Sequence, residues 1–156
     1  SIMQAHNLCY STLIPHNELH LHSHLTPNDY ETFIISSGPV HFVKKHITHS
    51  LLSQLLTAWL SKRKEIRKQL SSCSDPQLKT ILDKQQLAIK VTCNSVYGFT
   101  GVASGLLPCL KIAETVTLQG RCMLEKSKRF IEAVDANQLS KMVGYTVPCQ
   151  QGAQFR

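Results

Sequence analysis

Several features that define common classes of protein are missing from this chain of 156 residues. No apolar run approaches the ~20 residues that a membrane-spanning helix needs, and the N-terminus lacks the pattern of a secretory signal peptide. The six cysteines form no CxxC pair and are spread along the chain, so they indicate neither a structural zinc site nor a disulfide framework. We therefore expect no membrane partner and no metal site built by this chain.

Acidic residues are also scarce. Ten Asp and Glu stand against seventeen Lys and Arg, which gives a formal net charge of +7 with the histidines neutral. This excess of positive charge favours a polyanionic partner or a phosphorylated ligand. None of the acids forms a DxD or DTD sequence, so the chain lacks the paired aspartates that hold two catalytic metal ions in phosphoryl transfer.

The first 47 residues favour short strands and loops. Residues 30–35 and 40–43 read as two strands around a turn at 36–39, which contains a Gly-Pro pair. This pattern predicts a β-hairpin. Residues 1–9, by contrast, favour a short helix.

Long helices are predicted in the rest of the chain by the helical spacing of apolar residues, over 48–70, 77–97 and 111–134. Asp75 can cap the second helix, with Pro76 in its first turn, the position that proline favours. The short link between the first two helices predicts an antiparallel helical hairpin. Gly98 is expected to end the second helix, and a strand is expected around 142–147.

Lys90, Asn94 and Tyr97 fall at positions i, i+4 and i+7 of the second helix. They therefore share one face along about 10 Å of helix. An ammonium group, an amide and an aromatic ring suit a triphosphate, a polar edge and a base or sugar. Taken alone, such a stripe is more often the wet side of a helix.

Arg63 and Arg67 lie four residues apart near the end of the first helix and form a cationic stripe. If the two helices pack antiparallel, this stripe can face Lys90 across the hairpin. Two guanidinium forks and an ammonium group would then bind an anion with several oxygens. A basic helix end considered by itself is usually a solvated face or a partner of the helix dipole.

Two weaker candidates remain open. His20, His22 and His24 alternate as they would along one face of a strand, and three imidazoles can bind zinc. Exposed loop histidines are the commoner interpretation, because no cysteine or carboxylate completes the set. Cys93 is better interpreted as a packing residue than as a nucleophile, because nothing places a histidine beside it.

The pattern K-x3-N-S-x-Y-G at residues 90–98 resembles the fingers motif of family B DNA polymerases. The wider run LDKQQLAIKVTCNSVYGFTGVASGLLPCLKIAETVTLQGRCMLE is similar to the replicative polymerases of herpesviruses, and its details resemble the gammaherpesvirus branch. This resemblance implies that one group of side chains holds the triphosphate of the incoming dNTP: Arg63, Arg67 and Lys90. It implies that a second group forms the nucleotide pocket: Asn94, Ser95, Tyr97 and Gly98.

The resemblance also implies an α+β fold in three parts. Residues 1–47 would be a partial palm segment with a β-hairpin, 48–98 the fingers hairpin, and 99–156 a palm return segment of helix and then strand. The family's first catalytic aspartate lies in D-x-x-S-L-Y-P-S, whose final serine matches Ser1. The second lies in Y-G-D-T-D-S, expected shortly after Arg156. The chain is thus expected to be an internal fragment that is inactive alone, with no catalytic residue of its own and with Mg²⁺ held by residues outside it.

The function that follows from the resemblance is that of a DNA-directed DNA polymerase in viral DNA replication. The implied partners are dNTP, primer-template DNA and a processivity subunit, and the implied location is the host cell nucleus. The alternative is a non-catalytic nucleic-acid-binding helical module that uses the same basic helices on phosphate backbones. Such a module should lose affinity steeply with salt and ignore free dNTP.

Overall fold

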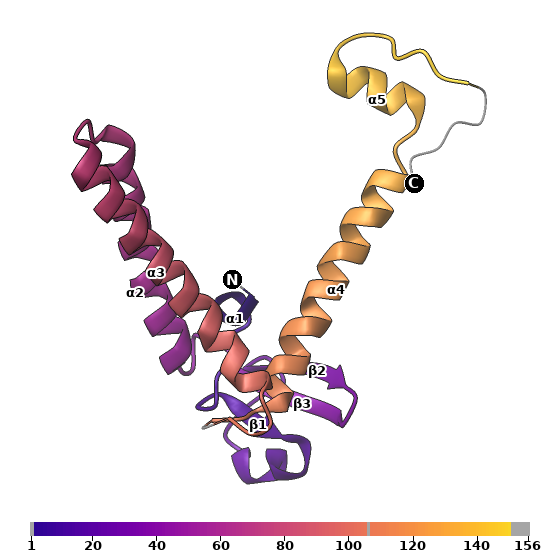
Figure 1. The fold of residues 1–156 in the computed structure, drawn as a ribbon. Coiled ribbons are helices and arrows are strands. Elements are labelled where there is room, and N and C mark those ends of the chain that lie inside the picture. The colour runs from indigo at the N-terminus through magenta and orange to yellow at the C-terminus, as the bar shows by residue number, and fades with distance from the viewer. Residues whose placement is uncertain (1, 106, 151–156) are drawn as a thin grey trace. The chain divides into compact units, whose positions relative to one another are not determined.

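The structure is a computed structural model, and it describes residues 2–105 and 107–150 (Figure 1). Ser1, which carries part of the expected match to a catalytic motif, lies outside the described residues. The chain divides after Thr117 into two compact units, which are considered separately. Within the described residues, no helix combines the length and the apolar character that crossing a bilayer requires.

A three-stranded antiparallel sheet in the order β1-β3-β2 forms one part of the first unit. The strands are β1 (Leu13–Pro15), β2 (Tyr30–Ile35) and β3 (Gly38–Val43). The β2–β3 pair confirms the predicted β-hairpin, with Phe33 opposite Val40. The turn is tighter than expected, because Gly38 adopts a φ of 106° that glycine tolerates and already begins β3.

The alternating histidines lie in a helix and, for His24, in the turn that follows it. A 3-10 helix, η1 (His16–His22), follows β1 directly, so the expectation that these histidines line one face of a strand is wrong. Pro15 is the last residue of β1 and has no N–H to extend the ladder. Alternation in sequence was therefore not a sign of extended backbone here.

Asn7 joins three elements at the base of the first unit. It follows the short helix α1 (Ile2–Ala5), which confirms the helix predicted near the N-terminus, and its φ is 54°. Its Nδ2 donates hydrogen bonds to the carbonyls of Val43 at 2.8 Å and Thr48 at 2.7 Å. Its Oδ1 accepts from the backbone N–H of Ser50 at 3.1 Å. A buried side chain with all these bonds fixes the sheet and the start of the next helix relative to α1.

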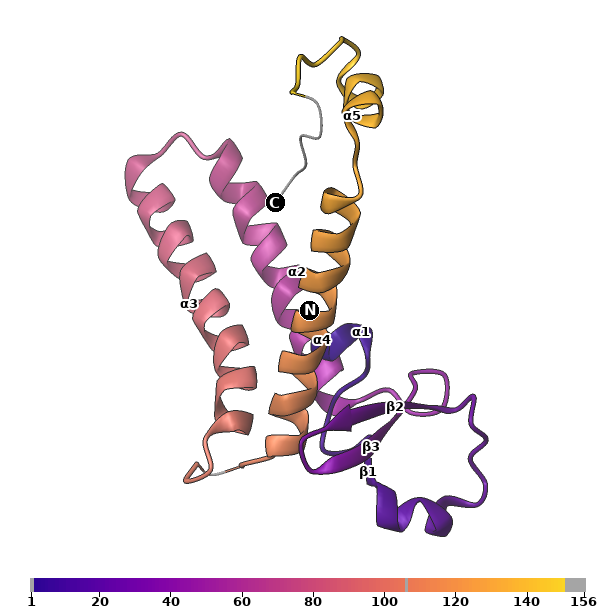
Figure 2. The same ribbon diagram turned by 90° about the vertical axis from the view of Figure 1, so that its right-hand side faces the viewer.

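Two long helices, α2 (Leu51–Ser72) and α3 (Pro76–Gly101), run alongside each other and are joined by residues 73–75 (Figures 1 and 2). Ser50 caps α2, and the predicted cap of α3 is confirmed, because the Asp75 carboxylate accepts from the N–H of Gln77 at 2.9 Å. The buried apolar side chains of the pair are Leu52, Leu56 and Ile66 on α2 and Leu82 and Val96 on α3. Their helical spacing explains why both helices form.

Helix α3 continues through Gly98 to Gly101, so the expectation that Gly98 ends it is wrong. One glycine in a helix costs only about 1 kcal/mol relative to alanine. Burial beyond that glycine offsets the cost, because Thr100 is fully buried and its carbonyl accepts from the N–H of Cys109 at 2.9 Å. Packing of the last turn therefore outweighs the local preference.

The third long helix, α4 (Leu110–Glu132), confirms the helix predicted over 111–134. Its first turns bury Ile112 and Thr115 within the first unit. The second unit contains the rest of α4 and a short helix, α5 (Ala136–Val143). The prediction of a strand around 142–147 is wrong. Met142 and Val143 are the last residues of α5, and residues 144–147 form no strand. A capping box of Asp135 and Gln138 begins α5 instead, and Gly144 in the left-handed conformation ends it.

Candidate functional site

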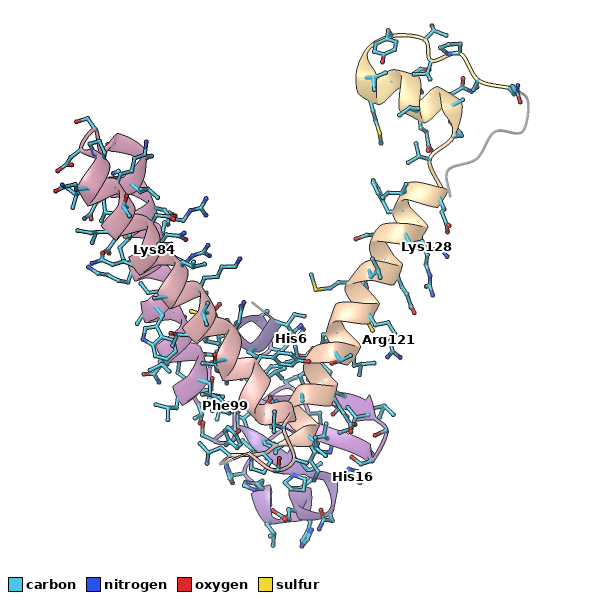
Figure 3. The ribbon with its side chains drawn as sticks, viewed as in Figure 1. His6, His16, Lys84, Phe99, Arg121 and Lys128 are labelled. Atoms are coloured by element: carbon cyan, nitrogen blue, oxygen red, sulfur yellow. The ribbon has the colours of Figure 1, made fainter. Side chains whose placement is uncertain are left out.

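Arg63 and Arg67, the two arginines singled out in the sequence, line one cavity of about 280 Å³ on α2. Leu60 and Lys64 complete the lining. Three cationic side chains therefore surround a small open cavity, and nitrogen-tipped side chains extend along this hairpin in Figure 3. Guanidinium groups chelate phosphate and carboxylate oxygens, so this cavity has the chemistry of an anion site.

Arg63 reaches across to α3. Its Nε donates a hydrogen bond to Oε1 of Gln86 at 3.2 Å, and Nε2 of Gln86 donates to the carboxylate of Asp83 at 3.0 Å. Gln86 lies four residues before Lys90 and eight before Asn94, which puts the three on one face of α3. Because Gln86 contacts α2, the face that carries Lys90 is turned toward α2.

Lys90 is exposed on this face, and it is not among the residues that line the arginine cavity. In the described part of the chain, the ion pairs that are present involve neither Lys90 nor Arg67. The structure thus puts Arg63 and Arg67 together in one cavity, with Lys90 on the facing helix. All three positive charges remain available to an anion.

Asn94 and Tyr97 line a second cavity of about 270 Å³. Its other walls come from α1, α2, α3 and α4: Ile2, Met3, Leu56, Leu60, Cys93 and Val116. Leu60 lines both cavities, so they adjoin at this side chain. The arrangement combines a cationic compartment with a largely apolar one that also presents an amide and a phenol.

The ring of Tyr97 is tied to α4. Its hydroxyl lies 3.2 Å from Oγ1 of Thr117, and the Thr117 hydroxyl itself donates to the carbonyl of Ala113 at 3.0 Å. Because the Thr117 proton is used in this way, Tyr97 is the donor to Thr117. The hydrogen bond fixes the direction in which the phenol points at the edge of the second cavity.

Ser95 and Gly98 lie apart from this cavity. The hydroxyl of Ser95 donates to the carbonyl of Val91 at 3.0 Å, within its own helix. Gly98 is exposed, and a Cβ built there would meet no described heavy atom within 4 Å beyond its own helix backbone and its two chain neighbours. Asn94 and Tyr97 therefore share the second cavity, and Ser95 and Gly98 are not among the residues that line it.

Leu60 and Gln86 were missed by the sequence analysis. Gln86 carried a usable signal, since it extends the stripe of Lys90 and Asn94 by one turn toward the N-terminus. Leu60 carried none, because an apolar residue at helical spacing is usually part of a core. Cys93 is half-buried in the wall of the second cavity, so it is less enclosed than a core cysteine.

The acidic residues of the chain do not fit a Mg²⁺ site. Mg²⁺ needs oxygen ligands gathered around one point, and the described residues contain no group of three His, Cys, Asp or Glu side chains that could hold a metal ion. Several carboxylates already have partners. Hydrogen bonds from Thr26 and then from His46 lower the pKa of Asp29 to about 2, and Glu31 bonds to His6 at 2.9 Å.

A polar cluster surrounds the buried His41 of β3, apart from the two cavities. Nε2 of His41 is 2.9 Å from Nδ1 of His16, and its Nδ1 is 2.8 Å from Oγ1 of Thr32. The ring of Tyr30 packs edge-on against that of His41. Burial lowers the pKa of His41, and the neighbouring His16 lowers it further. Both effects favour the neutral form of His41.

Comparison with known proteins identifies the class to which the chain belongs. The family model described as DNA polymerase family B matches residues 1–156. The chain belongs to this family, as its K-x3-N-S-x-Y-G motif predicted.

Herpesvirus proteins are among its relatives, which confirms the predicted resemblance to that branch. The chain is 69% identical over 156 residues to the DNA polymerase catalytic subunit of Human herpesvirus 8 type P (isolate GK18), covering 100% of this chain and 15% of that protein. It is 62% identical over 143 residues to the DNA polymerase catalytic subunit of Epstein-Barr virus (strain B95-8), covering 91% of this chain and 14% of that protein. The chain thus spans only a small part of the relatives it matches.

A solved structure shows the same fold. The family B DNA polymerase from the hyperthermophilic archaeon Pyrobaculum calidifontis matches with a TM-score of 0.63 at 24% sequence identity. The match covers 82% of this chain and 16% of that one. The predicted α+β class is confirmed by this match and by the small antiparallel sheet with its helices.

Proposed function

We propose that this chain is a segment of a DNA-directed DNA polymerase of viral DNA replication, and that it binds and orients the incoming dNTP on primer-template DNA. The pair of cavities that adjoin at Leu60 carries this proposal. A dNTP consists of a polyanion joined to a sugar and a flat base. A cationic compartment beside one lined by apolar groups, an amide and a phenol matches those parts in order.

In this proposal Arg63, Arg67 and Lys90 bind the triphosphate. The two guanidinium groups line the cationic cavity, where each can chelate two phosphate oxygens. Lys90 acts as a point charge from the facing helix. The charges of Arg67 and Lys90 support the assignment, because neither side chain takes part in the ion pairs of the described residues.

Asn94, Ser95, Tyr97 and Gly98 form the nucleotide pocket in this proposal. Asn94 and Tyr97 would face the sugar and base from the second cavity. Gly98 would leave room for the nascent base pair, because the space beside its backbone is open. The hydroxyl of Ser95 is already bonded to the carbonyl of Val91 in its own helix.

We further propose a division of the chain into a palm segment at 1–47, fingers at 48–98 and a palm return at 99–156. The fingers would close over a matched nucleotide, so that the shape of the base pair decides whether the cationic side chains reach the triphosphate. Because the acids of this chain do not fit a metal site, we place the Mg²⁺ ligands outside it. The 156 residues alone should then have no polymerase activity.

The wider setting rests on the family. Family membership supports primer-template DNA as a partner, and the similarity to herpesvirus polymerases supports a viral processivity subunit and the host cell nucleus. These assignments are proposals for the full-length polymerase that contains this chain.

The test is steady-state incorporation by that full-length polymerase. Lys90→Ala should raise the KM for dNTP about tenfold or more, because a charge-assisted bond to phosphate is lost, and should leave the Kd for primer-template nearly unchanged. Lys84→Ala is the matched control, because Lys84 has the same charge, lies exposed on α3 (Figure 3) and belongs to another face. Equal effects of Lys90→Ala on dNTP and DNA, with a steep dependence of DNA affinity on salt, would favour the non-catalytic nucleic-acid-binding module instead.

A further inference from the structure

We propose that Gln86 is a positioning residue that orients the guanidinium group of Arg63 in the triphosphate site. The inference rests on the proposed function and adds a residue on the opposite helix to that site. It is carried by the chain of hydrogen bonds from Asp83 through Gln86 to Arg63. Gln86 itself does not line either cavity.

The direction of the Gln86 amide is set by chemistry. An ionised carboxylate only accepts hydrogen bonds, so Asp83 requires the NH₂ group of Gln86 on its side. The amide oxygen then points toward Arg63, which only donates. Both bonds fail if the amide is turned over. Asp83 therefore fixes Gln86 in the one orientation that can hold Arg63.

The atom of Arg63 that Gln86 uses also matters. The bond goes to Nε, which leaves both terminal nitrogens of the guanidinium group unbonded within the described residues. Arg63 lines the cationic cavity, so the pair of N–H groups that suits two phosphate oxygens stays available there. A side chain already held in place loses less conformational entropy when its ligand binds.

No side chain among the described residues holds Arg67 by a comparable hydrogen bond. Arg67 lines the same cavity, yet it is exposed and takes part in none of the side-chain hydrogen bonds that fix Arg63. The two arginines therefore play unequal parts: Arg63 is oriented before the nucleotide arrives, and Arg67 is ordered by it. Loss of Gln86 should change the contribution of Arg63 alone.

The test replaces Gln86 by methionine in the full-length polymerase. Methionine keeps the length and the helix preference of glutamine, and its thioether sulfur is only a weak acceptor for Arg63. Gln86→Met should raise the KM for dNTP about three- to tenfold, with a smaller change in kcat and no change in the Kd for primer-template. Gln85→Met, at an exposed position of the same helix, is the matched control and should keep wild-type values.

Three further variants separate a positioning role from a structural one. In an Arg63→Ala background, Gln86→Met should have no further effect on KM, since Gln86 acts only through Arg63. In the double variant Asp83→Asn/Gln86→Glu, the new amide at position 83 can donate to the new carboxylate at position 86, and that carboxylate still accepts from Arg63. That carboxylate also offsets the charge of Arg63, so the KM of the double variant should improve on that of Gln86→Glu alone without reaching the wild-type value. Gln86→Glu alone puts two carboxylates side by side and should be worse than the double variant.

The outcomes distinguish this inference from the function on which it rests. If Arg63→Ala raises the KM for dNTP and Gln86→Met does not, the positioning role is overturned and the triphosphate site stands. An unchanged KM in Arg63→Ala would overturn the triphosphate site itself. A rise in KM from Gln86→Met that persists in full when Arg63 is absent would make Gln86 a structural residue of the hairpin.

Discussion

Replacing Gly98 by alanine should stabilise the end of α3 and slow nucleotide incorporation, two opposite effects of one methyl group. In the free protein the methyl group has room, because a Cβ at Gly98 would meet no described heavy atom within 4 Å beyond its own helix and chain neighbours. Alanine is favoured over glycine inside a helix by roughly 0.5–1 kcal/mol. The proposed nascent base pair would occupy the same open space in the working enzyme.

The stabilising half of this prediction is local, so it calls for a local measurement. A gain of that size should slow hydrogen exchange in the last turns of α3 by about two- to fivefold in the full-length polymerase without nucleotide. Gly101→Ala is the control for adding a methyl group to this helix. Its Cβ would lie 3.6 Å from Cβ of Ala113, and Gly101 is the last residue of α3, so the gain in protection should be smaller.

The catalytic half is measured by single-nucleotide incorporation. Displacing a base pair by about the width of a methyl group should lower kcat/KM for the correct dNTP by roughly 10- to 100-fold. Slower exchange combined with wild-type kcat/KM would refute the role of Gly98 in the nucleotide pocket. Faster exchange in Gly98→Ala would show instead that the added methyl group meets a steric clash beside α3.

Three other predictions concern single hydrogen bonds or protons. Thr117→Val removes the acceptor of the Tyr97 hydroxyl and should lower kcat/KM for dNTP by about two- to fivefold; Tyr97→Phe should match it, and a loss confined to one of the two variants would argue against a shared bond. The lowered pKa of His41 means that the folded state binds fewer protons there than the unfolded state. Neutral His41 therefore stabilises the fold above the ordinary pKa of 6.5, and this stabilisation is lost as the pH falls through the lowered pKa. Hydrogen exchange over β3, corrected for its intrinsic pH dependence, should therefore speed up as the pH falls below that range, and His16→Ala should change this profile by removing the neighbouring imidazole; a flat profile would contradict the argument. Asp75→Ala removes the cap of α3 and should cost about 1 kcal/mol locally, seen as faster exchange in its first turn, and Asp75→Asn should restore the protection, whereas equal exchange in both variants would show that the cap contributes nothing.

Periodicity predicted the long helices well, because each buries one stripe, and α2 and α3 also begin at a capping residue. Leu52 and Leu56 recur at helical spacing after Ser50, and Asp75 stands before Pro76. The end of α3 was not predictable from glycine alone. Burial of Thr100 beyond Gly98 decides the boundary, and burial is a property of the tertiary structure.

The error around 142–147 has a different physical origin. A short run with apolar and β-branched residues carries too little periodicity to distinguish a strand from the last turn of a helix. Asp135 and Gln138 form a capping box, and Gly144 ends α5 in the left-handed conformation. These local signals, which the sequence itself contains, favour a helix over a strand here.

In the candidate site too, features within one helix were predictable, and features that depend on the tertiary structure were not. Lys90, Asn94 and Tyr97 could be placed on one face from the sequence, since a single helix determines their spacing. The bond between Gln86 and Arg63 depends on how α2 and α3 are aligned along each other, and no pattern within one helix contains that alignment. The residues that share a face of one helix were predictable, whereas the specific hydrogen bond between two helices was not.

Asn7 has a consequence for protein engineering. Its amide bonds to the end of β3 and to the residues that begin α2, so the base of the hairpin is built partly by the N-terminal segment. A transplant of residues 51–101 into another scaffold would leave behind the group that anchors α2. The smallest portable version of this hairpin therefore includes α1, Asn7 and the sheet, and a chimeric polymerase with its junction just before α2 would inherit a loose hinge.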